Sequence, residues 1–195
     1  MPLFPRGTDP GPFPDYRRYK ATLRFTFRYR CAYCNITEGF RQGSDVFGVD
    51  HRQPRRLFPE LENSWSNLYY CCLMCNSMKG ARWPDKRLRL AGFEFVDPCV
   101  KDPFEWDWME TADGRLTAAT RTGEYSIVVL GLNREECIRF RLRRRVAASR
   151  LARCVVDIKS LREGDPGREL AMDAWRDATA QWEEAYGDFP FVRNR

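Results

Sequence analysis

The chain carries the pair Cys31-Ala32-Tyr33-Cys34 and, further along, the pair Cys72-Leu73-Met74-Cys75. Two C-x-x-C pairs are typical of one zinc ion held by four thiolates. Such a site is closed and tetrahedral, stabilises the fold and leaves no position open for a substrate. We therefore expect a compact module to form around a structural zinc ion bound by Cys31, Cys34, Cys72 and Cys75.

The single histidine, His51, follows Asp50 and lies between the two cysteine pairs. If zinc takes the four cysteines, the imidazole is not needed as a structural ligand. Its ordinary pKa of about 6.5 suits proton transfer near neutral pH. An Asp-His pair at the end of a strand would otherwise be read as a hydrogen-bonded pair, and only its setting between the cysteines and two asparagines, Asn67 and Asn76, favours catalysis.

Composition indicates an ordinary folded protein of one domain, or a small core with an appendage. The chain has 195 residues, of which 43% are hydrophobic and 31% charged. The net charge of +6, carried mostly by arginine, favours a nucleic-acid partner, although a biased genome produces the same excess without any function.

The sequence does not show the apolar segments that are typical of secreted and membrane proteins. The first residues lack the apolar region of a signal peptide, and the longest apolar run, Ile127–Leu132, is too short to span a bilayer. We expect a reducing, cytoplasmic setting without membrane attachment. Four further cysteines without a pairing pattern are expected to be buried as small hydrophobic residues: Cys71, Cys99, Cys137 and Cys154.

The periodicity and the turn residues predict an α+β fold in three parts. These are a proline-rich arm over residues 1–15, a module over 16–83 that contains both cysteine pairs, and an α+β extension over 84–195 that ends in helices. The predicted helices cover 16–30 (with a strand over 23–29 as the alternative), 73–82, 133–161 with Asn133 as its N-cap, and 168–186. The predicted strands cover 46–51, 67–71, 93–98, 104–108 and 125–130, with turns at Asp113-Gly114 and Thr122-Gly123.

Residues 31–80 resemble the HNH endonuclease family in its zinc-stabilised ββα-metal form. The resemblance rests on four motifs in order: Cys31-x-x-Cys34, Val49-Asp50-His51-x-x-Pro54, Asn67-Leu68 and Cys72-x-x-Cys75-Asn76-x-x-Lys79-Gly80. Each motif alone is weak, whereas the ordered set is specific. Two departures stand out: Asn76 replaces a histidine that many members carry, and Arg55-Arg56-Leu57-Phe58-Pro59 replaces a common Gly-Gly segment, so substrate contacts do not transfer there.

The resemblance implies a role for each site residue. His51 would be the general base that activates water, and Asn67 would brace the loop and orient the imidazole. Asp50 and Asn76 would hold one catalytic divalent ion, and their carboxylate and amide oxygens suit Mg²⁺, with Mn²⁺ as the other candidate. Strict alternation along a strand sends Asp50 and His51 to opposite faces, so a bulge or the strand end must re-aim one of them.

Four basic residues, Lys79, Arg52, Arg55 and Arg82, are candidates for nucleic-acid contact. The arginines of the helix over 133–161 are expected instead to form a solvated face, with Ile138, Leu142, Val146 and Leu151 turned inward. Trp106 and Trp108 are expected in the core.

The expected function is a metal-dependent DNA endonuclease, with residues 84–195 setting the choice of substrate or partner. A short chain favours a nicking or non-specific enzyme, or the effector of a larger system. Some bacterial anti-phage systems pair a small HNH subunit with an ATPase, which makes a partner-activated subunit one alternative. A zinc-stabilised nucleic-acid-binding module without catalysis is the other, and RNA stays open as the substrate.

Overall fold

The computed structural model describes residues 1–186. It is an α+β structure with two small antiparallel sheets, β1–β2 and β3–β4. The elements in chain order are η1 (Tyr16–Tyr19), α1 (Lys20–Thr26), α2 (Glu38–Arg41), β1 (Phe47–His51), η2 (Pro59–Leu61), η3 (Trp65–Asn67), β2 (Leu68–Cys72), α3 (Leu73–Lys79), α4 (Lys86–Leu90), α5 (Pro103–Trp106), β3 (Trp108–Glu110), β4 (Leu116–Ala118), α6 (Arg121–Val129), α7 (Glu135–Ser160) and α8 (Pro166–Tyr186).

The first sheet pairs β1 with β2 in a continuous register that runs from Phe47 opposite Cys72 to His51 opposite Leu68. Helix α3 follows β2 directly, because Cys72 serves as its N-cap. The two strands and the helix predicted in this segment are confirmed. The helix ends at Lys79, earlier than predicted, where Gly80 adopts a φ of 51°.

The segment before the first cysteine pair is helical, so the strand alternative for residues 23–29 is wrong. Asp15 caps η1 through a bond from the Arg17 amide, and α1 continues to Thr26. Arg28 and Tyr29 then take φ values of 51° and 60°, which turns the chain away from the helix axis.

Three strands predicted after residue 90 are not present. Residues 93–98 contain no strand, residues 104–106 lie in α5, and residues 125–129 lie in α6. Side-chain caps explain the two helices: Asp102 accepts from the Phe104 amide with Pro103 in the first turn, and Thr120 accepts from the Gly123 amide. Local capping outweighs the strand preference of the aromatic and β-branched residues, and Gly123 lies in a helix, not in the predicted turn.

The turn predicted at Asp113-Gly114 does join two strands, β3 and β4. Trp108, on β3, is buried as predicted, whereas Trp106 is 59% exposed and its assignment to the core is wrong. Asn133 does not cap the long helix. It binds both backbone groups of Leu116, and Arg134 occupies the N-cap position instead.

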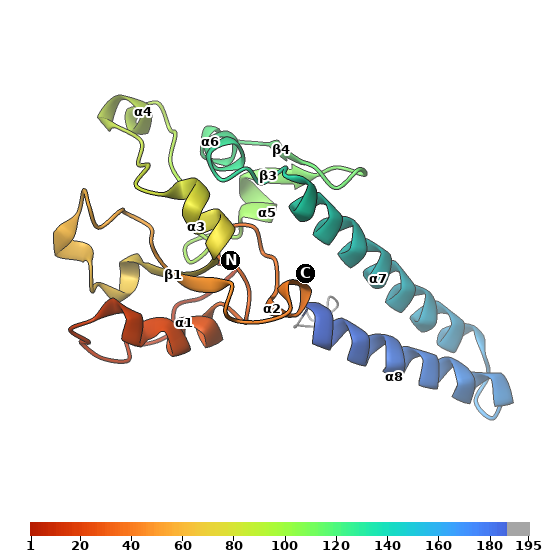
Figure 1. Cartoon of the computed structure of the whole chain (residues 1–195). Helices are drawn as coiled ribbons and strands as arrows, with labels where there is room; N and C mark the ends of the chain where they lie inside the picture. The colour runs from red at the N-terminus through yellow and green to blue at the C-terminus, as the bar shows by residue number, and fades with distance from the viewer. Residues whose placement is uncertain (187–195) are drawn as a thin grey trace.

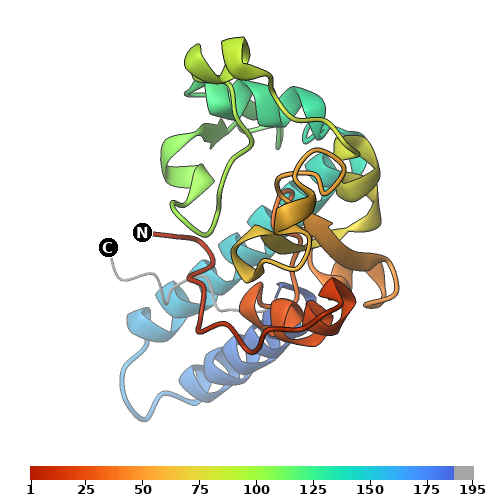
Figure 2. The same ribbon diagram turned by 90° about the vertical axis from the view of Figure 1, so that its left-hand side faces the viewer.

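Helices α7 and α8 form a hairpin whose connection, residues 161–165, lies far from the first sheet (Figure 1). A view turned by 90° shows the same two helices side by side (Figure 2). The end of α8 returns to α2, where the Thr37 hydroxyl donates to the Ala185 carbonyl at 2.5 Å and the Arg30 guanidinium donates to the Tyr186 carbonyl at 2.5 Å. Both predicted helices are confirmed.

One hydrophobic core joins all three predicted parts of the chain. It contains Leu3 and Phe4 of the arm, Leu23 of α1, the first sheet, and residues as distant as Phe140 of α7. A separate small cluster inside the hairpin consists of Leu151, Ala178 and Trp182. Cys71 and Cys137 are buried as predicted, and Cys99 and Cys154 are partly buried. Within residues 1–186, no helix has the length and apolar character needed to cross a membrane.

Candidate functional site

The four predicted zinc ligands come together. Cys31 and Cys34 lie in the turn after α1, Cys72 ends β2 and Cys75 lies in the first turn of α3. Their sulfur atoms all lie within 4.8 Å of one another, and all four residues are buried. Four buried thiols at this separation fit a tetrahedral zinc ion, so the donor set matches a closed structural site.

The N-cap residue of α7, Arg134, contributes a cation to this cluster. The guanidinium of Arg134 donates to the sulfur of Cys75 at 3.5 Å and to that of Cys72 at 3.9 Å. A zinc ion with four thiolates carries a net negative charge, and a neighbouring cation that donates to the sulfur atoms offsets it. No pattern in the sequence indicates this contact, because Arg134 lies 59 residues after Cys75.

His51 occupies the end of β1 and is held from two sides. Its Nε2 lies 2.8 Å from the backbone carbonyl of Glu62, and its ring makes an edge contact with the ring of Tyr16 at a centroid distance of 4.6 Å. A carbonyl only accepts hydrogen bonds, so Nε2 carries the proton and Nδ1 is left with the basic lone pair. The imidazole is 7% exposed.

Burial lowers the pKa of His51 below its ordinary value. The hydrogen bond to the Glu62 carbonyl and the nearby Asp50 carboxylate oppose this shift, and Arg55 adds to it. The imidazole is therefore neutral at pH 7, which is the protonation state that a general base requires.

Asn67 braces the loop between the strands. Its Oδ1 accepts from the Gln53 amide at 2.8 Å, and its Nδ2 donates to the carbonyls of Gln53 at 3.0 Å and Leu61 at 3.3 Å. Leu61 precedes Glu62, the residue whose carbonyl holds His51. Asn67 thus acts on the backbone that orients the imidazole, and its own side-chain hydrogen bonds go to Gln53 and Leu61.

Asp50 has a different set of neighbours from His51. Its Oδ2 accepts from the Tyr33 hydroxyl at 2.6 Å and its Oδ1 from the Lys79 ammonium at 3.1 Å, and Lys79 also donates to the His51 carbonyl at 2.6 Å. Burial raises the pKa of Asp50, and Lys79 and Tyr33 oppose the rise. The register of β1 is regular through both residues, so the expected bulge is not found and alternation separates the two side chains.

Asn76 follows Cys75 on α3 and is partly buried. Within the described part of the chain its side chain makes no hydrogen bond, so its amide oxygen is available to a ligand. Of the two predicted ligands of the divalent ion, Asn76 offers an amide oxygen that is free to bind it. Both carboxylate oxygens of Asp50, in contrast, already accept hydrogen bonds from Lys79 and Tyr33.

The four basic candidates lie in different settings. The ammonium of Lys79 is fully buried, and Arg52, with a side chain 18% exposed, pairs with Asp97 at 3.4 Å. Arg55 is 53% exposed and pairs with Glu62 at 2.8 Å. Arg82 is exposed, and its guanidinium donates to the Met78 carbonyl.

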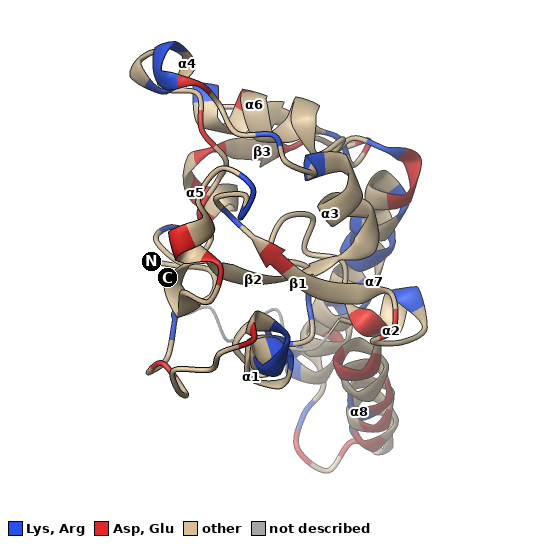
Figure 3. Cartoon of the chain, turned by 60° about the vertical axis from the view of Figure 1, so that its left-hand side comes forward, with Lys and Arg blue, Asp and Glu red and all other residues tan. Residues whose placement is uncertain are grey.

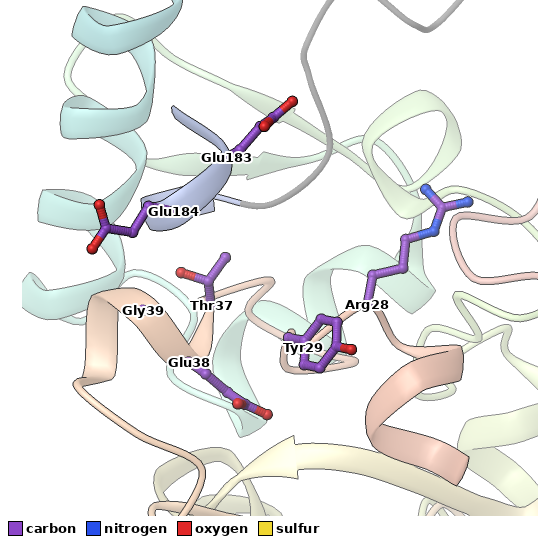
Figure 4. A pocket seen from close by; sticks show the side chains of 7 residues that line it. All are labelled: Arg28, Tyr29, Thr37, Glu38, Gly39, Glu183 and Glu184. Carbon is purple, nitrogen blue, oxygen red and sulfur yellow. The ribbon is translucent and has the colours of Figure 1, made fainter. Parts of the chain in front are cut away.

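A cavity of about 220 Å³ lies away from these residues (Figure 4). It is lined by Arg28 and Tyr29 after α1, by Thr37, Glu38 and Gly39 at α2, and by Glu183 and Glu184 at the end of α8. Its walls contain none of the predicted catalytic or metal-binding residues. The candidate site lies on the first sheet and α3.

Comparison with known proteins supports the same segment. Residues 31–82 match the family model of the HNH endonuclease. These residues form an HNH endonuclease domain. No curated protein and no solved structure matches the chain.

The HNH domain does not contain every residue that shapes its candidate site. Tyr16 comes from the segment before it, and Arg134 from the N-cap position of α7. Glu62 lies inside the domain but acts through its carbonyl, which every residue type possesses, so its side chain carries no signal in the sequence.

Proposed function

We propose that this protein is a metal-dependent endonuclease that hydrolyses DNA phosphodiester bonds with His51 as the general base. In this proposal β1, β2 and α3 form the ββα-metal core of the HNH domain. The observation that carries it is the Glu62 carbonyl 2.8 Å from Nε2 of His51, which leaves Nδ1 as the proton acceptor. A binding module without catalysis has no need of a neutral imidazole fixed in this way.

The residues of the chain divide the chemistry between them. Nδ1 of His51 takes a proton from the attacking water, and Asn67 keeps the loop that carries Glu62 in place. Asp50 and Asn76 are the proposed ligands of one Mg²⁺ or Mn²⁺ ion. When bound, that ion would supply charge neutralisation at the scissile phosphate. The chain contains a single histidine, so no second imidazole can protonate the leaving group.

Cleavage of supercoiled plasmid tests this proposal. Purified wild type should nick the plasmid with Mg²⁺ or Mn²⁺, and EDTA should stop it. His51→Ala should lose the activity while its zinc content and melting temperature stay those of wild type. Cleavage that survives in His51→Ala would overturn the assignment of the base.

Variants of the proposed ion ligands separate their roles. Asp50→Asn and Asn76→Ala should each raise the concentration of Mg²⁺ needed for half-maximal cleavage. Full activity at the wild-type Mg²⁺ requirement in both variants would remove these residues as ligands.

A second candidate function is a subunit that a partner activates, such as the ATPase partner of a bacterial defence system. The observation that favours it is the Asp50 carboxylate, which is 4% exposed and engaged by Lys79 and Tyr33. A divalent ion must compete with the Lys79 ammonium for Oδ1, so a partner or substrate that moves Lys79 would switch the site on. The isolated protein should then need far more Mg²⁺ than is needed once activated, and saturation of the isolated protein at trace Mg²⁺ would contradict this candidate.

A further inference from the structure

The HNH domain offers a polyanion two exposed cations that have no carboxylate partner among residues 1–186, Arg56 and Arg82. Lys79 is fully buried against Asp50, and Arg52 is paired with Asp97. Arg55, although exposed, shares its charge with Glu62. An enzyme that acts on nucleic acid needs cations for the phosphate backbone, which supplies most of the sequence-independent affinity. Exposed cations elsewhere in the chain would therefore add to the contact that Arg56 and Arg82 can make.

Seven arginines of α7 divide into two groups, of which the first is structural. Arg141 is buried and donates to the Gly114 carbonyl at 2.6 Å. Arg144 and Arg145 reach the carboxylate of Glu110 at 2.6 Å and 2.8 Å. These three side chains fasten α7 to the β3–β4 hairpin and are not available to a ligand.

The second group lies on one exposed face, which we call the arginine stripe. Its members are Arg139, Arg143, Arg150 and Arg153, with Val146, 70% exposed, in the middle. The steps between them are alternately four and three residues, the spacing that keeps side chains on one face of a helix. At 1.5 Å per residue the stripe is about 21 Å long.

The charges of the arginine stripe are not neutralised within the fold. Arg139, Arg150 and Arg153 have no ion pair or hydrogen bond to any of residues 1–186, and Arg143 lies over the ring of Phe40 at 5.7 Å. On the same face the stripe is bounded by one acidic residue at each end, Glu135 and Asp157. Four arginines, two on each side of Val146, thus form a cationic patch of defined length.

The neighbouring helix does not extend this patch. Acidic residues recur along α8, whereas basic residues recur along α7 (Figure 3). The outer face of α7 is the side of the hairpin that suits a linear polyanion, because its cations follow one another along a straight axis.

We propose that the arginine stripe binds the phosphate backbone of duplex DNA outside the HNH domain. This inference rests on the proposed function and adds to it the surface that holds the substrate. A length of about 21 Å corresponds to about six base pairs at 3.4 Å each. Arginine donates bidentate hydrogen bonds to phosphate, and contacts of this kind hold DNA without reading its sequence.

The experiment is a salt titration of DNA binding by fluorescence anisotropy with a labelled 24-base-pair duplex. All proteins carry His51→Ala, so cleavage cannot interfere. The test variant is Arg150→Gln with Arg153→Gln. The matched control, Lys159→Gln with Arg162→Gln, removes the same charge from exposed positions near the tip of the hairpin that lie off the stripe.

The test variant should bind DNA several-fold more weakly, and its slope of log affinity against log salt should fall by about 1.8, or 0.9 for each lost phosphate contact. The control should keep the wild-type slope, and Arg150→Lys with Arg153→Lys should restore most of it. Three results would refute the proposal that the arginine stripe binds DNA. These are an equal loss of affinity in the test and control variants, an unchanged salt slope in the test variant, or no binding of the duplex by the protein that carries His51→Ala alone. Binding through the stripe by a protein that never cleaves DNA would leave this inference standing and refute the nuclease proposal.

Discussion

The guanidinium of Arg134 lies 3.5 Å from the sulfur of Cys75 and couples the long helix α7 to the predicted zinc site. Its second sulfur contact, to Cys72 at 3.9 Å, joins the same side chain to the end of β2. The pKa of Arg134 is raised, because the attraction of the surrounding thiolates outweighs its burial. The residue is a permanent cation beside a cluster that is anionic once zinc is bound.

Replacing Arg134 should weaken the zinc site. Arg134→Gln removes the positive charge, and we expect zinc affinity to fall by about 10- to 100-fold, the usual effect of losing a partner of a metal ligand. Competition with a chromophoric chelator measures the loss, and Lys159→Gln, distant on the same helix, is the control. Wild-type affinity in Arg134→Gln would show that the contact does not support the metal.

Loss of zinc itself should unfold the module. Cys75→Ser removes one of four ligands, and a structural zinc ion supplies folding free energy directly. We expect a large fall in melting temperature and loss of the helical signal, with EDTA acting on wild type in the same direction. A variant with wild-type zinc content and melting temperature would refute the assignment of the ligands.

Tyr16 should position the imidazole. Tyr16→Phe keeps the ring against His51, whereas Tyr16→Leu removes it, and misplacement of a base by a small distance costs up to about 100-fold in rate. We therefore expect kcat to fall in Tyr16→Leu with KM little changed, and Tyr16→Phe to retain activity.

NMR spectroscopy can test the contact between the rings of Tyr16 and His51 without measuring catalysis. Because the chain has a single histidine, its imidazole protons give one set of NMR signals. Those signals should move in Tyr16→Leu as the ring current of Tyr16 is lost, and stay near their wild-type positions in Tyr16→Phe. Unmoved signals in Tyr16→Leu would show that the two rings are not in contact in solution.

Glu38 should give the fold an acid-dependent contribution to stability. Burial raises its pKa, but hydrogen bonds from Arg24 at 2.7–2.8 Å and from Tyr70 at 2.5 Å outweigh this, so the pKa lies below its ordinary value. A lowered pKa in the folded state means stability that is present above the unfolded pKa of about 4.3 and lost as pH falls through the folded pKa.

Urea unfolding of wild type and Glu38→Gln tests this. At pH 7 the variant should be less stable by roughly 1.5–3 kcal/mol, the range for hydrogen bonds to a charged group. The difference should shrink below about pH 4.3. Zinc release in acid affects both proteins, so the difference reports Glu38, and a gap independent of pH would contradict the assignment.

The sequence predicted the first half of the molecule better than the second. The C-x-x-C spacing identified all four clustered cysteines, and the strands that carry His51 and Cys72 were placed within one residue. These features depend on local spacing. In the second half, caps by Asp102 and Thr120 decided for helix where strand was predicted.

Two predictions for α7 were wrong: that all of its arginines form a solvated face, and that Leu142 and Val146 turn inward. Val146 and Leu142 were expected to face inward but are 70% and 37% exposed, whereas Arg141 is buried. Arg141 is buried because carbonyl groups from the β3–β4 hairpin accept its hydrogen bonds, and a hydrophobic pattern does not report such partners.

The hairpin of α7 and α8 returns to the place where it starts. At its start, Arg134 contacts the sulfur of Cys75. At its end, the carbonyls of Ala185 and Tyr186 accept hydrogen bonds from Thr37 and Arg30, which flank the first cysteine pair. The hairpin therefore meets the cysteine module at two points, in addition to the bonds from Arg141, Arg144 and Arg145 to the β3–β4 hairpin. In amide hydrogen exchange, the start of α7, the end of α8 and the cysteine module should therefore open as one cooperative unit.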